Sequence, residues 1–209
     1  MVAGEGLMRA AGGNSSTIFT LGPAGTDAHH IAKGLGDVTL VDSFPTAMRL
    51  AWESSEFALV CPGFVERAES GITDSWVSLH FRYFGRMRIL KAWTAPTKPM
   101  CIAVNMHLAS GLGDVESVAL HPSTSAFAER YVPSAKHVYV GAKPLAVAEA
   151  EKGNAAACIG SIDIVDSAKN LKIEEVFYPE MLWCLYQRDA VDQEGFPEPR
   201  AGACNAVEQ

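Results

Sequence analysis

Short apolar runs rich in β-branched and aromatic residues alternate along this chain with segments whose apolar residues recur every three or four positions, and few folds accommodate this alternation. In the first third of the chain the runs are residues 17–21, 39–41 and 57–61, which have the composition of buried parallel strands. Residues 27–35 and 44–54 lie between them and show helical spacing. The pattern predicts a β-α-β-α-β lobe.

A second set of runs and helical patterns repeats this organisation from residue 100 onward. Strands are predicted at 100–104, 117–120, 138–140 and 156–159, and helices at 123–131, 144–152 and 162–169. Residues 72–99 separate the two sets and are rich in aromatic and basic side chains; alternation in their later part predicts a half-buried strand that crosses between lobes. Residues 172–177 and 182–187 are predicted to return to the first lobe.

The predicted fold class is α/β, with two α/β lobes and a cleft between them. Two lobes joined by two crossings place this cleft beyond the carboxyl ends of the parallel strands, where such proteins bind ligands. We predict a first lobe made of residues 17–98 plus 172–189, and a second lobe made of residues 99–171. The polar ends, residues 1–16 and 190–209, are predicted to be disordered tails.

Charge and hydropathy limit the partners of these 209 residues. A net charge of −7 argues against a nucleic-acid partner, because a phosphate backbone would repel the protein. We therefore interpret the aromatic and basic stretch 76–93 as a lobe crossing with an aromatic surface on which a homodimer can form. No apolar run is long enough to cross a bilayer, and the first 16 residues lack the apolar core of a secretory signal. We expect a cytoplasmic protein with no membrane contact.

The five cysteines stand far apart, without the paired spacing of zinc or redox sites, so no metal site is predicted. Four of them lie in apolar runs and are expected to be small core residues: Cys61, Cys101, Cys158 and Cys184.

The segment Leu21-Gly22-Pro23-Ala24-Gly25-Thr26-Asp27 joins the first predicted strand to the first predicted helix. Glycines permit the turn, and a helix N-terminus offers backbone N–H groups that suit a carboxylate. The same residue types also make an ordinary strand-to-helix turn with a capping residue, so both interpretations stay open.

Residues 22–32 resemble the opening G-P-x-G-T-x-S-H-x-A-A pattern of the prephenate dehydratase family. Further along, Val41-Asp42-Ser43-Phe44 resembles that family's second strand and helix, residues 118–123 resemble its V-x-S-H-P-Q turn, and residues 155–159 resemble its A-A-I strand. The resemblance covers most of residues 17–189. It implies a fold of two α/β lobes, like the type II periplasmic binding proteins.

Two family signatures are replaced in this chain. Where dehydratases carry P-I-E-N-S, the sequence reads Cys61-Pro62-Gly63-Phe64-Val65, and where they carry T-R-F, with a Thr held essential for dehydration, it reads Leu182-Trp183-Cys184. We expect no regulatory ACT domain of the kind that usually follows in this family. The dehydratase chemistry, in which the ring hydroxyl is protonated and leaves as water, needs a proton donor that these segments lack.

In lacking these two signatures, the sequence resembles one branch of the family, the prephenate decarboxylases of bacilysin-type antibiotic biosynthesis. The T-L-G-P-x-G-T opening, the H-P-S turn, and the M-x-W-x-L end at Met181, Trp183 and Leu185 resemble the same branch. The resemblance implies decarboxylation of prephenate without aromatisation, to a dihydro-4-hydroxyphenylpyruvate for specialised metabolism, with no metal or organic cofactor.

Two other functions stay open, and in each the partner is a small carboxylate such as prephenate. One is a prephenate or arogenate dehydratase that uses other proton donors and gives phenylpyruvate or phenylalanine. The other is a non-catalytic small-carboxylate-binding domain, because a fold does not fix a function.

The candidate catalytic residues are Thr26, His121 and Lys143. Thr26, with the backbone amide of Gly25, is expected to bind a carboxylate, unless it is a plain helix cap. His121 closes a predicted strand and is expected to contact the substrate, unless it is a loop histidine with local partners.

Other candidates surround these three in the sequence. Ser123 is expected to cap the next helix and direct its N-terminus at a second carboxylate. Lys143, which follows Gly141 at another strand end, is expected to neutralise an oxygen of the dianion, unless it is an exposed lysine before Pro144. Arg67 and Lys33 are weaker cationic candidates, because long basic side chains are usually solvated.

Cys61, Phe64 and Trp183 replace polar positions of the family by apolar ones. We expect them to line the substrate site and to keep it dry around the departing carboxylate, which favours loss of its charge as CO2. Simple core packing is the alternative. His29 or His30 is a candidate proton donor, since histidine titrates near neutral pH.

Overall fold

The computed structural model describes residues 16–68 and 71–189, and the tails predicted at residues 1–15 and 190–209 lie outside this part of the chain. The described residues form two compact units. The first unit takes the residues up to Phe64, Ile72–Ala95, and those from Met181 onward, whereas the second takes Val65–Gly71 and Pro96–Glu180.

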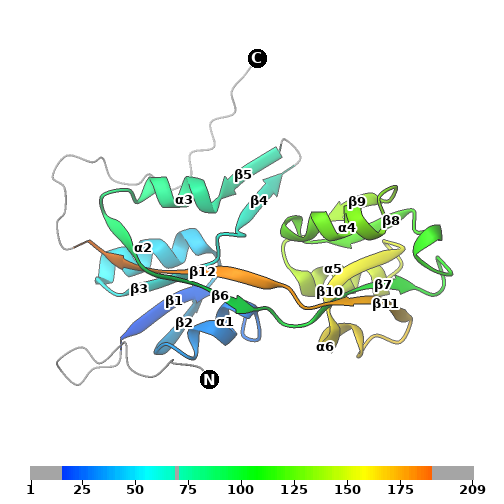
Figure 1. Cartoon of the computed structure of the whole chain (residues 1–209), viewed down its shortest axis with the longest axis horizontal. Helices are drawn as coiled ribbons and strands as arrows, with labels where there is room; N and C mark the ends of the chain where they lie inside the picture. Colours follow the sequence, from blue (N-terminus) through cyan, green and yellow to red (C-terminus); the bar gives the residue numbers. More distant parts are fainter. Residues whose placement is uncertain (1–15, 69–70, 190–209) are drawn as a thin grey trace, which may run out of the picture. The chain divides into compact units, whose positions relative to one another are not determined.

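The first unit is built on a five-stranded sheet with the order β2-β1-β3-β12-β6 (Figure 1). Its strands are β1 (Thr17–Leu21), β2 (Asp37–Val41), β3 (Phe57–Val60), β6 (Met87–Pro96) and β12 (Glu180–Arg188). The strand β1 pairs in parallel with β2 and β3, as predicted, but β2 lies at the edge of the sheet and none of its residues is buried. The returning strand β12 runs antiparallel to β3, with Cys184 opposite Val60.

Three helices accompany this sheet: α1 (Asp27–Ala32), α2 (Phe44–Ser54) and α3 (Trp76–Arg82). The helix α2 begins where Ser43 accepts a hydrogen bond from the Thr46 amide, with Pro45 in its first turn, and it ends at Ser55, which adopts the left-handed conformation with φ 59°. It packs against β1 and β3. Its buried face is the one that the helical spacing predicted.

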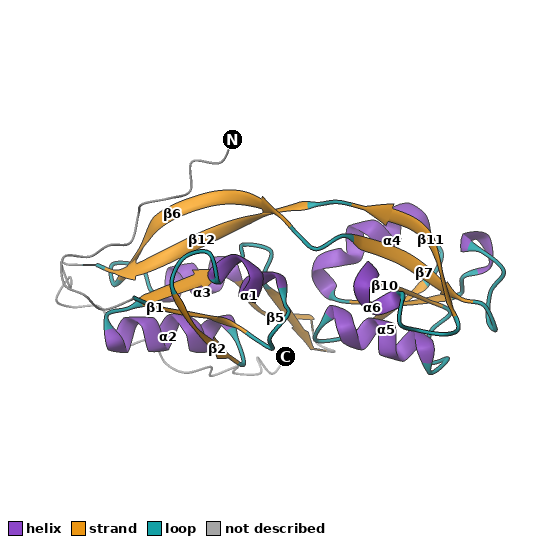
Figure 2. Cartoon of the chain, turned by 90° about the horizontal axis from the view of Figure 1, so that it is seen from below, coloured by secondary structure: helices purple, strands orange, loops and turns teal. Residues whose placement is uncertain are grey.

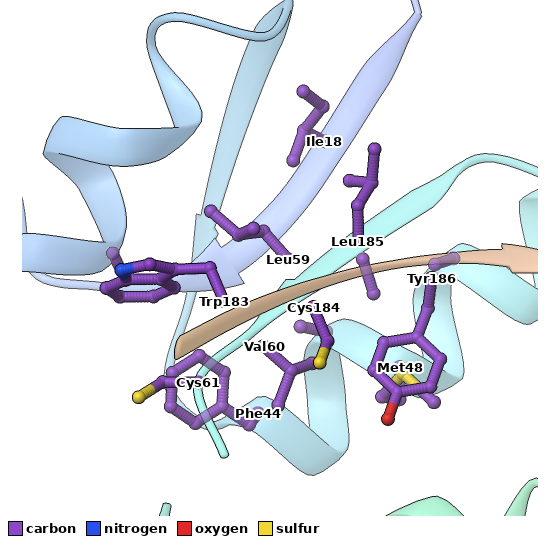
Figure 3. Packing of buried hydrophobic residues seen from close by; sticks show 14 of the residues in the cluster. Ile18, Phe44, Met48, Leu59, Val60, Cys61, Trp183, Cys184, Leu185 and Tyr186 are labelled. Carbon is purple, nitrogen blue, oxygen red and sulfur yellow. The ribbon is translucent and has the colours of Figure 1, made fainter. Parts of the chain in front are cut away.

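Side chains fill both faces of the sheet at β12 (Figure 3). Ile18, Leu59, Trp183 and Leu185 lie on one side of the strand, and Phe44, Met48, Val60, Cys184 and Tyr186 lie on the other. Because successive residues of a strand point to opposite faces, β12 has to be apolar at consecutive positions, and it is buried over residues 183–186.

The aromatic and basic stretch after residue 72 contains a helix, α3, that the sequence did not predict. The Trp76 indole donates a hydrogen bond to the Tyr186 hydroxyl at 3.0 Å, and His80 Nδ1 lies 3.1 Å from the same hydroxyl, so α3 is held on β12. Basic residues of the stretch contact partners of their own unit, since Arg82 pairs with Asp74 and Arg86 stacks on Trp52. Two short strands, β4 (Val65–Ala68) and β5 (Gly71–Ser75), pair with each other and were also not predicted.

The second unit is built on a five-stranded sheet with the order β11-β7-β10-β8-β9. Its strands are β7 (Met100–Asn105), β8 (Ser117–Leu120), β9 (Lys136–Tyr139), β10 (Ala157–Ser161) and β11 (Leu171–Phe177). The strand β8 pairs in parallel with β9 and β10.

Two expectations for this region are wrong. The strand β7 does not repeat the parallel pattern, because it runs antiparallel to both β10 and β11. Residues 172–177 do not return to the first lobe, because they belong to β11 in the second sheet. The physical reason is that β7 is buried along its whole length and needs a hydrogen-bonded neighbour on each side, and β11 provides the second one.

Helices and two 3₁₀ turns complete this unit: α4 (Ser125–Tyr131), α5 (Lys143–Glu151), α6 (Ile162–Val165), η1 (Leu112–Asp114) and η2 (Pro122–Thr124) (Figure 2). One apolar cluster joins α4 to Ile102, Val118 and Leu120, and a second joins α5 and α6 to the alternate residues of the same strands, Cys101, Ala103 and Ala119. The two faces of the sheet are thus covered by different helices.

Two sequence expectations can be compared directly with these cores. Cys61, Cys101, Cys158 and Cys184 are all buried and none is disulfide-bonded, which confirms their predicted place in the core. Burial raises the pKa of Cys101 to about 11 and that of Cys158 to about 12, so both thiols stay protonated. No helix in the described part of the chain is long and apolar enough to span a membrane.

Candidate functional site

Polar residues gather at one edge of the second sheet, where β8, β9 and β10 end. His121 directly follows β8, Gly141 and Lys143 follow β9, and Ser161 is the last residue of β10. Because these three strands are parallel, their carboxyl ends share one edge. Met100 begins the antiparallel strand β7 and is paired with Ser161, which brings it to the same edge.

His121 and Ser123 form a close pair at this edge. The Ser123 amide donates a hydrogen bond to His121 Nδ1 at 3.2 Å, and the Ser123 hydroxyl lies 2.7 Å from the same nitrogen. Since Nδ1 accepts the amide hydrogen, we infer that it carries no proton and that the neutral ring is protonated at Nε2. The pair therefore provides an N–H donor at Nε2 and a cap for η2.

Lys143 lies within electrostatic reach of His121. Burial of the imidazole, assisted by the charge of Lys143, lowers the pKa of His121 below its ordinary value. Lys143 is half-buried, and its ammonium group donates to the sulfur of Met100 at 3.6 Å. A neutral hydrogen-bond donor and a fixed cation thus stand together, which suits a carboxylate with an adjacent polar oxygen.

Space is available at this edge beside Gly141. A Cβ atom placed on Gly141 would meet no other atom within 4 Å. His121, Ser123, Gly141 and Lys143, four residues predicted from the sequence, are therefore gathered at one edge of one sheet, where the backbone leaves room.

Tyr139, Ser125 and Arg67 adjoin the same edge, and the first two were not among the predicted site residues. Tyr139 ends β9, its hydroxyl lies 3.1 Å from His137 Nδ1, and the Ser125 hydroxyl donates to it at 3.4 Å. The Arg67 guanidinium stands 5.1 Å from the centre of the Tyr139 ring. Tyr139 does not stand out in the sequence, because aromatic residues are common in β-strands.

In the first unit, Gly25 and Thr26 make local contacts. The Gly25 amide donates to His29 Nδ1 at 2.9 Å, the Thr26 hydroxyl donates to the Leu21 carbonyl at 3.2 Å, and that hydroxyl accepts from the His29 amide at 3.3 Å. Gly25 has a φ of 90°, which other residues rarely adopt, so the turn requires a glycine there. Thr26 is the N-cap of α1, which was one of its two interpretations.

Cys61, Phe64 and Trp183 also belong to the first unit. The pairing of Cys184 with Val60 puts Trp183 level with Cys61, one residue beyond the end of β3. The Cys61 sulfur accepts a hydrogen bond from the Gly63 amide at 3.3 Å, and the Phe64 ring meets the Phe44 ring edge-on at 5.5 Å. These contacts give the carboxyl end of β3 an apolar surrounding.

Trp183 places a buried indole nitrogen in this apolar region. Its side chain is only 2% exposed, and its indole nitrogen has no hydrogen-bond partner among the residues described. Leu182, beside it, is 43% exposed. The segment Leu182-Trp183-Cys184 therefore presents no hydroxyl and no guanidinium.

The structure thus places the predicted residues in two groups, each within its own unit. Gly25, Thr26, Cys61, Phe64 and Trp183 lie in the first unit, and His121, Ser123, Gly141 and Lys143 lie in the second. Within residues 16–68 and 71–189, no group of three or more His, Cys, Asp or Glu side chains is arranged to hold a metal ion.

Comparison with known proteins finds matches among solved structures. No protein-family model matches the chain, and no curated protein matches it. The structure of prephenate dehydratase from Arthrobacter aurescens in complex with L-Phe matches with a TM-score of 0.54 and 15% identity, over 84% of this chain and 60% of that chain. The chain shares the fold of that prephenate dehydratase. This confirms the predicted α/β fold class.

Two further matches have lower TM-scores. The prephenate dehydratase of Staphylococcus aureus matches with a TM-score of 0.48 and 9% identity, over 86% of this chain and 68% of that chain. The periplasmic VFT2 domain of BvgS from Bordetella pertussis matches with a TM-score of 0.49 and 13% identity, over 83% of this chain and 80% of that chain. The chain spans less than two thirds of the length of the Arthrobacter structure.

Proposed function

We propose that this protein decarboxylates prephenate without aromatising it, giving a dihydro-4-hydroxyphenylpyruvate for specialised, antibiotic-type metabolism. The shared fold with a prephenate dehydratase supports the substrate class. The observation that carries the choice of reaction is the apolar replacement at Leu182-Trp183-Cys184, because a dehydratase needs a proton donor where this segment has none.

The proposed reaction breaks the bond between the quaternary ring carbon and its carboxylate, which leaves as CO2. The electron pair of that bond moves into the ring double bonds, and a ring carbon takes up a proton from a donor. The ring hydroxyl stays in place, and the ring keeps two double bonds. Without an acid at the hydroxyl, the competing loss of water, which would aromatise the ring, is disfavoured.

The second unit supplies groups that suit the retained 2-oxo acid arm of prephenate. Lys143 provides a cation for the arm's carboxylate, and the Nε2–H of His121 provides a donor for an oxygen of the same arm. Ser123 keeps His121 in the tautomer that can donate. His121 and Lys143 act in this proposal as binding and positioning groups.

The first unit supplies apolar groups. Cys61 and Trp183 are buried in the apolar cluster of this unit, and Phe64 packs against that cluster, so their surroundings are apolar. The local hydrogen bonds of Gly25 and Thr26 favour their role in capping α1, so the proposal gives them no ligand contact.

Incubation of the purified protein with prephenate tests the proposal, with ultraviolet absorbance and proton NMR of the product recorded beside an enzyme-free control. We expect a product that forms faster than in the control and keeps its hydroxyl. Formation of phenylpyruvate would instead establish a dehydratase. Thermal stabilisation by prephenate without turnover would establish a carboxylate-binding domain.

Two variants sharpen this test. His121→Ala is expected to lower turnover at least tenfold, which corresponds to about 1.4 kcal/mol of activation free energy. Leu182→Thr restores the hydroxyl of the T-R-F signature and is expected to produce traces of phenylpyruvate. If His121→Ala turns over at the normal rate, His121 has no place in the site.

A further inference from the structure

We infer that Arg67 is a second cation of the anion site in the second unit, where it binds, together with Lys143, the carboxylate of a 2-oxo acid. Tyr139 is the positioning residue that holds the Arg67 guanidinium there. The inference rests on the proposed function for the identity of the ligand.

The placement of Arg67 follows from two contacts within the second unit. The strand β4, which carries Arg67, packs against η2, which directly follows His121. The Arg67 guanidinium lies 5.1 Å from the centre of the Tyr139 ring, and Tyr139 is paired with Leu120, the residue before His121. Arg67 therefore stands beside the strand ends that carry His121 and Ser123.

The N–H groups of Arg67 are available to a ligand. Its side chain is exposed, and no carboxylate in residues 16–68 or 71–189 is paired with it. Other arginines of the chain differ, because Arg49 pairs with Glu53 and Arg82 pairs with Asp74. The cation–π contact with the Tyr139 ring uses none of the N–H donors of the guanidinium in a charge-assisted hydrogen bond, so these donors can bind a carboxylate.

Tyr139 is held firmly enough to orient Arg67. Its hydroxyl is engaged by Ser125 and by His137, so the ring is fixed at its far end. Tyr139 is nevertheless 43% exposed at the end of a strand, so packing in the core does not explain an aromatic residue there. A fixed, exposed ring is a suitable platform for a cation.

Together, Arg67, Lys143 and His121 suit a 2-oxo acid better than a simple carboxylic acid. A 2-oxo acid presents a carboxylate beside a carbonyl oxygen. Arg67 and Lys143 supply positive charge for the carboxylate, and the Nε2–H of His121 supplies a neutral donor for the carbonyl oxygen. Phenylpyruvate, a stable 2-oxo acid, is therefore a suitable probe.

Titration calorimetry with phenylpyruvate tests the inference in the whole protein. Arg67→Gln is expected to weaken binding about tenfold or more, because a charge-assisted hydrogen bond is lost, and Arg67→Lys should be intermediate. The matched control is Arg130→Gln, which removes an exposed arginine of the same unit whose guanidinium lies 5.6 Å from the centre of the Tyr131 ring. The control should bind like the unchanged protein; equal affinity of all the variants would overturn the inference.

Tyr139 has its own pair of variants. Tyr139→Phe keeps the ring and should bind phenylpyruvate within about twofold of the unchanged protein, whereas Tyr139→Leu removes the platform and should weaken binding as Arg67→Lys does. Added guanidinium ion should partly restore binding to Arg67→Ala and leave Tyr139→Leu unrestored. Binding of phenylpyruvate by Tyr139→Leu with the affinity of the unchanged protein would contradict the positioning role.

Prephenate kinetics separates this inference from the proposed function. With prephenate as substrate, Arg67→Gln should raise KM about tenfold and leave kcat within about twofold, because the retained arm is bound equally in the ground and transition states. Turnover of prephenate with an unchanged KM in Arg67→Gln would overturn the inference and leave the function standing. No turnover of prephenate, with Arg67-dependent binding of phenylpyruvate, would overturn the function and support the inference.

Discussion

At the scale of single residues, the tautomer of the His121 ring is set by Ser123, two positions along the chain. The Ser123 amide and hydroxyl both approach Nδ1, which leaves Nε2 to carry the proton of the neutral ring. Burial and the nearby Lys143 both disfavour a second proton and lower the pKa of the ring. His121 is thereby kept as a neutral donor near physiological pH.

This lowered pKa makes the free energy of unfolding depend on pH. In the unfolded chain His121 takes up a proton below its ordinary value of 6.5, whereas the folded protein does so only at lower pH. The folded state therefore loses stability as pH falls below about 6.5, because the unfolded state binds more protons. His121→Gln should flatten this part of the pH profile, as measured by urea unfolding between about pH 7.5 and pH 5.5.

The control for this prediction is His30→Gln, at an exposed position on α1. The His30 variant should keep the pH dependence of the unchanged protein. An identical slope in the His121 variant and the unchanged protein would mean that His121 does not contribute.

Sequence reasoning found His121, Ser123 and Lys143 because each follows a predicted strand, and the ends of parallel strands meet at one edge. It could not decide between the two interpretations of Thr26, since a cap and a carboxylate site use the same residue types. It missed Tyr139 and Ser125, because their place beside the site depends on which elements are neighbours.

At the scale of elements, the chain's periodicity predicts most boundaries well. The bounds expected for β1, α2 and β8 agree with the structure. The helix α3 was missed because its exposed face carries Val77 and Phe81, the latter 66% exposed, so apolar residues do not mark one buried stripe. The direction of β7 and the partner of β11 were missed because strand pairing is not a local property.

The N-cap of α1 gives a test of Thr26. Thr26→Ala removes the acceptor of the His29 amide and should cost about 1 kcal/mol of stability, as should Ser43→Ala at the N-cap of α2. Chemical denaturation measures both costs. If Thr26→Ala weakens prephenate binding tenfold while Ser43→Ala leaves it unchanged, Thr26 contacts the ligand after all.

The packing of α5 on β10 depends on a glycine. A Cβ atom at Gly160 would overlap Cγ2 of Val147, so Gly160→Ala should destabilise the protein by about 1–3 kcal/mol. Adding Val147→Ala should recover part of that loss, because the two sites are in contact. Urea unfolding of the single and double variants measures the coupling, with Gly141→Ala as the unhindered control. Strictly additive effects would contradict the predicted overlap.

At the scale of the whole molecule, the two units contain separate apolar cores. One cluster is centred on Met48, Leu59 and Trp183 in the first unit, and two clusters cover the faces of the second sheet. The chain has four tryptophans, and all of them lie in the first unit: Trp52, Trp76, Trp93 and Trp183. Tryptophan fluorescence therefore reports on the first unit alone, whereas far-ultraviolet circular dichroism reports on both.

This distribution of tryptophans lets one variant test whether the units unfold separately. Two units with their own cores need not unfold in a single step, and a lesion in one should then leave the other unchanged. Gly160→Ala, which lies in the second unit, should lower the urea midpoint seen by circular dichroism and leave the midpoint seen by tryptophan fluorescence in place. Leu59→Ala, in the first unit, is the reciprocal control and should lower the fluorescence midpoint. If Gly160→Ala moves both midpoints equally, the units unfold as one cooperative structure, and the four tryptophans report on the whole chain.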